Sequence, residues 1–294
     1  MRYQTILHGL ILMLVLAAAA AGVFYRTEGE RIHHTTIRGE QATIQGHGLY
    51  RYDPVEVADE GIVWDAINLF VGLPLFAVAI LLTARHRLRG RLLLGGLLFY
   101  FFYVYLMYAT MVAFNSLFLI YVAIFALSLI AFLLNLREID VAGLPAHISE
   151  RFPRRLLAGY AMAMGVMILL LWLRLIISIM GTGRFPPQFA GMVTLPTQAL
   201  DLGLIVPLMT STAILLWRRS PSGYLLASIG VSFGLLLCLV LPAWIIVPLI
   251  RRGTLDAVEA VPFLAGSVAG LFLAWMFFRN INERAGTSVA GPDR

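Results

Sequence analysis

The chain has 294 residues, of which 60% are hydrophobic and only 13% are charged, and its mean hydropathy is +0.85. Soluble globular domains carry roughly 25% charged residues, so this composition excludes an ordinary soluble protein and indicates a polytopic membrane protein. The net charge of +6 comes from Arg clusters between apolar runs, which orient membrane helices rather than bind nucleic acid.

Eight apolar runs are each long enough to cross a hydrocarbon core of about 30 Å. They cover residues 5–25, 62–83, 91–112, 116–136, 156–180, 197–217, 223–248 and 261–279. The first run is Ala-rich and could also be a cleaved signal peptide, but the repeat described below favours a retained helix. Because Arg gathers in one set of loops and in the C-terminal tail, the positive-inside rule predicts a cell-membrane protein with both termini in the cytoplasm.

Segment 26–61 is the main extramembrane piece of the first half. Its β-branched and aromatic residues, broken by glycines, predict a small extracytoplasmic β-hairpin between the first two membrane helices. The following "DPVE" predicts a short surface helix with Asp53 as its N-cap and Pro54 at its first position. Gly61 is expected to separate this surface helix from the second membrane helix.

An internal repeat appears when the chain is shifted by 133 residues, which places 68–93 on 201–226 without a gap. Both segments follow the pattern [ND]-L-x4-P-L-x6-L-x2-R-x4-G-x-L-L. Matches of Leu are common by chance in membrane helices, whereas registered Pro, Arg and Gly matches are not. Since four helices per repeat is an even number, both halves would insert the same way up.

The sequence therefore predicts an all-α polytopic membrane protein of eight transmembrane helices arranged as two parallel four-helix repeats. Chance similarity between helical hairpins is the alternative. The predicted parts are a first repeat (1–136), a cytoplasmic linker (137–155), a second repeat (156–279) and a disordered cytoplasmic tail (280–294).

Polar residues within the apolar runs are the candidate site, because charges in lipid are costly and face a bundle interior or water. Asp65 and Asn68 share a helix face, and Asp201 is the repeat counterpart of Asn68. Arg174 lies at a depth similar to that of Asp201 on the preceding helix, so we expect the two to pair. The predicted outward-facing pocket between the repeats comprises Asp65, Asn68, Tyr105, Tyr108, Asn115, Arg174 and Asp201.

The same residues also fit a structural role. Asp at a helix N-terminus caps free N–H groups and interacts favourably with the helix dipole, and Tyr at this depth is typical of an aromatic belt. A proton or ion path is a third alternative, but the shallow depth of the acidic residues counts against it.

Several cofactor sites are excluded or disfavoured. The chain has no Lys for a Schiff base and one cysteine, Cys238, so a disulfide is excluded. His33, His34 and His47 lack zinc-site spacing, and His8 has no second His in a membrane run with which to hold a haem. No nucleotide-binding or hydrolase motif occurs, so no cofactor or metal is expected.

Three functions remain open from sequence. The first is a multi-pass protein that binds or transports a small or lipidic molecule. The second is a membrane enzyme acting on a lipid-linked substrate at the outer face, with Asp65, Arg174, Asp201 and the Tyr residues as its working groups. The third is a scaffold or assembly subunit that uses the aromatic stretch 99–108 as an interface. Membrane lipid is an expected partner, and nucleic acid is not.

Overall fold

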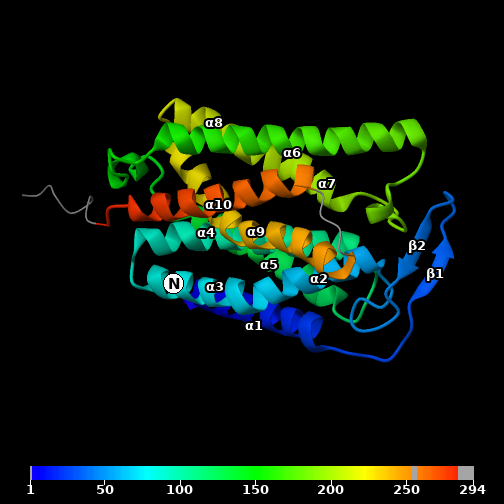
Figure 1. Cartoon of the computed structure of the whole chain (residues 1–294). Coiled ribbons are helices and arrows are strands. Elements are labelled where there is room, and N and C mark those ends of the chain that lie inside the picture. The colour runs from blue at the N-terminus through cyan, green and yellow to red at the C-terminus, as the bar shows by residue number, and fades with distance from the viewer. Residues whose placement is uncertain (1, 253–256, 284–294) are drawn as a thin grey trace, which may run out of the picture.

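The structure is a computed structural model that describes residues 2–252 and 257–283. Within these residues, eight helical stretches are long and apolar enough to cross a membrane, as predicted (Figure 1). The long elements are α1 (Arg2–Phe24), α2 (Val55–Ile67), α3 (Leu73–Ala84), α4 (Leu88–Met111), α5 (Phe118–Arg137), α6 (Arg154–Thr182), α8 (Val206–Trp217), α9 (Pro221–Arg252) and α10 (Ala257–Arg279). The short ones are η1 (Asn68–Gly72), η2 (Leu144–His147), η3 (Pro187–Phe189), α7 (Pro196–Leu200) and η4 (Asp201–Ile205).

The predicted hairpin is present. Strands β1 (Ile32–Thr35) and β2 (Gln41–Ile44) pair antiparallel, and Gly39 takes a left-handed conformation (φ +81°) in the turn between them. The hairpin lies beyond one end of the helices, which we call the hairpin end (Figure 1). Both ends of the described chain lie at the opposite end, which we call the termini end.

The predicted surface helix is not a separate element. A single helical rod runs from Val55 through α2, the π-helical turn η1 and α3, and it passes Gly61 without a break. Gly61 instead allows close packing, because an added Cβ would lie 2.9 Å from the ring of Tyr50. Asp53 does not cap the helix; its carboxylate accepts a hydrogen bond from the Ala113 N–H at 2.7 Å.

A second rod of the same construction runs through α7, η4 and α8. The widened π turns begin at Asn68 and Asp201. A proline, Pro74 or Pro207, lies two residues after the end of each turn. Proline cannot donate to the carbonyl four residues earlier and its ring clashes with it, so a widened turn before the proline relieves the conflict.

The turns that end the two rods are also alike. His86 and Arg219 both adopt left-handed backbone conformations, with φ of 57° and 59°. Gly90 and Gly223 then pack directly on the rods: an added Cβ would lie 2.4 Å from Leu82 at the first position and 2.6 Å from Leu215 at the second. Each of these pairs is separated by the same 133 residues as η1 and η4.

Helix α4 lies at the centre and is buried along most of its length. It packs on α3 and α5 of the first half (residues 1–136) and on α9 of the second half (residues 156–279). The α4–α9 crossing is close because Gly96 lacks a side chain: a Cβ there would lie 2.2 Å from the Cβ of Ser232. Phe99, Tyr100 and Tyr103 of the aromatic stretch of α4 then pack against Phe233 of α9.

Helix α6 is the most exposed of the long helices described. It packs along α8, and its buried residues are small or lie near the termini end: Leu157, Ala158, Ala161 and Gly165. It makes few contacts with α10, whereas α1 packs against α5 in the first half. The second half is thus open on one side where the first half is closed.

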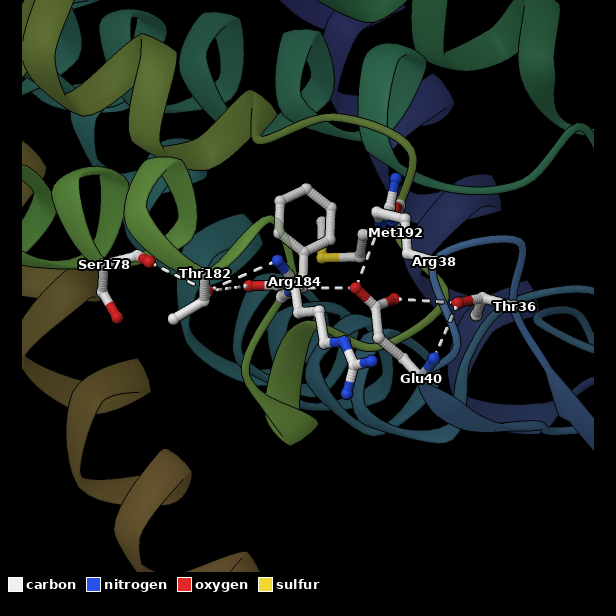
Figure 2. A network of polar contacts seen from close by, with 8 residues as sticks. Thr36, Arg38, Glu40, Ser178, Thr182, Arg184 and Met192 are labelled. Atoms are coloured by element: carbon white, nitrogen blue, oxygen red, sulfur yellow. Dashed lines mark hydrogen bonds and ion pairs between the residues drawn. The ribbon is translucent and has the colours of Figure 1, made fainter.

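At the hairpin end, Glu40 ties the hairpin to the segment that follows α6 (Figure 2). Its Oε1 accepts hydrogen bonds from the Phe185 N–H at 2.7 Å and from Arg38 at 3.0 Å. Arg38 also donates to the Met192 carbonyl and lies 4.2 Å from the centre of the Phe185 ring. We call this contact the hairpin clasp.

At the termini end, residues 280–283 join the two halves. Glu283 accepts hydrogen bonds from the N–H groups of Leu88 and Arg89 at 2.8 and 3.3 Å, so it caps α4. Ile281 pairs with Ile148 of the predicted linker. The predicted disordered tail is therefore wrong for 280–283, and its remainder, 284–294, lies outside the described residues.

Candidate functional site

The seven residues predicted to form one pocket do not converge on a single place. Five belong to the first half: Asp65, Asn68, Tyr105, Tyr108 and Asn115. Asp201 belongs to the second half and lines a cavity, while Arg174 is exposed on α6. The cavity lies mainly within the second half, and residues of the first half close one side of it.

Asp65 is fully buried in a packed polar core. The hydroxyls of Tyr50 and Tyr108 donate to its two oxygens, and Tyr108 also donates to the Gly61 carbonyl at 2.9 Å. Helix α1 lies directly against the carboxylate, since a Cβ added at Gly22 would come within 1.6 Å of Asp65 Oδ2. This tight packing fits the structural alternative for Asp65.

Asn68 extends the same core. Its side-chain oxygen accepts a hydrogen bond from Tyr100 at 2.8 Å. Its amide nitrogen and the hydroxyls of Tyr105 and Tyr121 have no hydrogen-bond partner among the described residues. Asn115 accepts from the Leu117 N–H at 2.9 Å and so shapes the turn before α5.

Asp53 and Glu40 are buried carboxyls outside the spanning helices, and sequence reasoning missed both environments. Burial raises the pKa of Asp53 to about 7, against one hydrogen bond from Ala113 that lowers it. Burial also favours a higher pKa for Glu40, but hydrogen bonds from the Phe185 N–H, Arg38 and Thr36 outweigh it and lower the pKa below its ordinary value. The number of hydrogen bonds that each carboxylate accepts therefore decides whether its pKa is raised or lowered.

Asp201 is the predicted residue that reaches open space. Tyr103 donates to its Oδ1 at 2.6 Å, and the indole of Trp172 donates to its Oδ2 at 2.8 Å. The predicted pair with Arg174 is wrong: no ion pair joins the two in the described structure, and residues two apart on a helix face nearly opposite ways, so Trp172 turns inward and Arg174 outward. A Trp at that depth, needing an acceptor for its N–H, was the signal for the true partner.

The cavity beside Asp201 has a volume of about 130 Å³ and is enclosed mainly by α6, α8, α9 and α10. Trp64 of α2 and Tyr103 of α4 close its first-half side. Its described lining is largely apolar; Asp201 is the one carboxylate in it, and none of these residues is Arg or His. A Cβ added at Gly234 would meet no atom within 4 Å, so this glycine faces empty space.

The hollow follows from side-chain size on α9. Each α9 residue that lines the cavity can be compared with the α4 residue 133 positions before it. Four of these α4 residues are large, at most 1% exposed, and fill the core of the first half. The pairs are Leu97 and Gly230, Phe101 and Gly234, Tyr105 and Cys238, and Tyr108 and Leu241. The α9 members are smaller in every pair, and at Gly234 the position that the Phe101 ring occupies in the first half is vacant. This loss of bulk in register was readable from the sequence.

A groove of about 410 Å³ runs between α6 and α10 on the outer surface of the bundle. It shares Tyr160 and Leu273 with the cavity, and Arg155 lies at its termini end. The Tyr160 hydroxyl donates to the Gly266 carbonyl at 2.9 Å and so bridges the two helices. Tyr160 therefore stands between the groove and the cavity.

No protein-family model matches the chain, and no curated protein or solved structure matches it. The functional argument consequently rests on the geometry of the site.

Proposed function

We propose that this multi-pass membrane protein binds or transports a small lipidic molecule, and that the cavity between α6, α8, α9 and α10 is its binding site. The observation that carries the proposal is a largely apolar cavity with a single carboxylate, Asp201, beside a groove on the outer surface. Ligand sites are typically apolar hollows with a few placed polar groups. An apolar chain in this hollow would gain the packing contacts that its lining lacks.

The binding role is favoured over an enzyme that uses Asp65, Arg174 and Asp201 together. Asp65 is sealed under α1, and Arg174 points away from Asp201. The groups that such an enzyme would need for acid/base work and anion binding are therefore apart.

The same proposal includes two parallel repeats, with boundaries at 1–136 and 156–279. The matching π turns, the left-handed residues His86 and Arg219 and the packed glycines Gly90 and Gly223 support a duplication at a spacing of 133 residues. In this view, the first repeat kept a filled core and the second acquired the binding site.

We also assign the hairpin end to the outside and both termini to the cytoplasm of the cell membrane. The support is the excess of Arg in the termini-end loops, which hold "RHRLRGR" (85–91) and "ERFPRR" (150–155). The site residue Asp201 would then lie in the outer half of the membrane.

The test is to identify molecules that copurify with the full chain, by native mass spectrometry and by extraction into organic solvent. We expect a bound lipidic molecule in the natural protein and little or none in Gly234→Phe, which restores the ring found at position 101. Gly9→Phe is the matched control, because Gly9 also faces no atom within 4 Å but is exposed on α1.

Equal loss in both variants would point to general damage, and Gly9→Phe is expected to keep the ligand. The proposal fails if the natural protein carries no lipidic molecule, or if Gly234→Phe retains it in full.

A further inference from the structure

We infer that the ligand of this cavity is a single-chain amphiphile whose head group donates hydrogen bonds and carries no acid group, such as a medium-chain alcohol or amine, and that Asp201 recognises this head. This inference rests on the proposed function, since it assigns a chemical class to the occupant of the same site.

The hydrogen-bonding capacity of Asp201 is the first step. An ionised carboxylate offers about four lone-pair positions on its two oxygens. Tyr103 and Trp172 use one on each oxygen. The remaining positions can accept from a ligand hydroxyl or amine, whereas a second acceptor would find no donor there.

The balance of charge is the second step. Among the described residues of the lining, Asp201 has no basic neighbour, and the chain contains no Lys. Glu60 accepts a hydrogen bond from the Trp64 indole at 3.2 Å and adds a second acidic residue behind the cavity wall. An anionic head placed here would be desolvated beside like charge, which is strongly unfavourable.

An unpartnered polar group within the lining is the third step. Ser267 of α10 is 3% exposed and lines the cavity, and its hydroxyl has no hydrogen-bond partner among the described residues. Buried polar groups are normally paired, so an orphan hydroxyl in a hollow indicates a missing polar partner. Ser267 lies about 12 Å along the bundle from Asp201, because Gly266 packs beside Met164, eight residues from Trp172 on α6, so this hydroxyl is a polar contact separate from the head group.

The shape of the lining is the fourth step. Lining residues extend from Thr197 and Asp201 near the hairpin end to Leu157 and Leu273 near the termini end. A cavity that is long but has a volume of only about 130 Å³ is narrow, so it favours one short hydrocarbon chain of about eight carbons over a two-chain lipid. The head would then lie at Asp201 and the chain would run along α9.

The experiment compares three probes of equal chain length, matched to the cavity volume, on the delipidated full chain in detergent: octanol, octylamine and octyl phosphate. Binding is followed by native mass spectrometry and by thermal shift. We expect one-to-one complexes with the alcohol and the amine, and at least about tenfold weaker binding of the phosphate. In Asp201→Asn this preference is expected to shrink severalfold while chain binding persists.

Two variants keep the outcome interpretable. Tyr103→Phe removes a donor at the same place but leaves the carboxylate, so the preference should remain. Gly234→Phe should weaken all three probes alike. Equal binding of the three probes, or an unchanged preference in Asp201→Asn, overturns the inference on the head group while the cavity still binds chains. Failure of every probe to bind the natural protein overturns the proposed function itself.

Discussion

At the residue scale, two buried carboxyls at the hairpin end behave in opposite ways. Glu40 accepts several hydrogen bonds and its pKa is lowered, whereas Asp53 accepts one and its pKa is raised to about 7. A carboxyl whose pKa is raised on folding binds more protons in the folded state than in the unfolded one at intermediate pH. Its contribution to stability is then fully present at low pH and is lost as pH rises.

Asp53→Asn tests this difference. The window runs from the ordinary value of 3.8 to about 7, so the natural protein should lose stability across it and level off above. Asparagine keeps the acceptor for the Ala113 N–H without the charge, so the variant should be more stable by about 1–4 kcal/mol near pH 8 and nearly unchanged near pH 4. Thermal unfolding at both pH values is the measurement, and a variant that is less stable at high pH would contradict it.

At the element scale, the contact between α4 and α9 holds the two halves together. Gly96 lies so near Ser232 and the Ile229 carbonyl, 2.2 and 3.0 Å from an added Cβ, that no larger residue fits without moving a helix. Since neighbouring aromatic rings pack around the same crossing, the helices cannot separate locally. The packing of these aromatic rings therefore depends on the close approach of α4 and α9 at Gly96.

Gly96→Val should lower the melting temperature markedly, because overpacking in a tight core costs about 1–3 kcal/mol or more. Gly9→Val, at an exposed position of α1, is the control and should change it little. Thermal unfolding in one detergent compares the two. Equal melting temperatures for Gly96→Val and the natural protein would mean that the helices are less closely packed than described.

At the scale of the whole molecule, the first half is a filled bundle and the second a hollow one with a seam between α6 and α10. Tyr160 bridges that seam, and Cys238 lies in the cavity behind it. A Cβ added at Gly270 would lie 2.6 Å from the Tyr160 hydroxyl and 2.7 Å from the Cys238 sulfur. The tyrosine and the thiol are thus immediate neighbours, and the chain's single cysteine reports on access from the seam.

Tyr160→Ala should speed the labelling of Cys238 by a membrane-soluble maleimide, because it removes the ring between groove and cavity. Tyr160→Phe keeps the ring and loses only the hydrogen bond, so it should label nearly as slowly as the natural protein. The rate is followed by mass spectrometry on the intact chain. Unchanged labelling in Tyr160→Ala would mean that this residue does not close the cavity.

The sequence was a good guide to the spans, the hairpin and the polar positions that begin the two π turns. Hydrophobic run length determines how much chain can cross a membrane, and it is a local property. The sequence could not predict that the helix continues through Gly61, because glycine is compatible both with a helix break and with close helix packing. Only the Tyr50 ring, brought there by the fold, decides between them.

The candidate site was harder to predict. Depth along the helices brings Asp201 to the level of residues 172–174, but rotation about the helix axis, which depth does not give, turns Trp172 toward Asp201 and Arg174 away from it. Asp65 shares a helix face with Asn68, and Asn68 shares its repeat position with Asp201, but neither relation brings the three side chains to one place. The cavity is instead marked by a difference between the repeats, since Phe101 of α4 corresponds to Gly234 of α9.

Two contacts, the hairpin clasp at one end and the contact of Glu283 with α4 as a second clasp at the other, join the two halves of the molecule. Glu40 binds the hairpin of the first half to the segment after α6, and Glu283 binds the end of the second half to α4. A rocker-like tilt of one half against the other would have to break both clasps and slide the α4–α9 contact. Opening the seam between α6 and α10 need break neither clasp, because these two helices make few contacts with each other while α6 stays packed along α8.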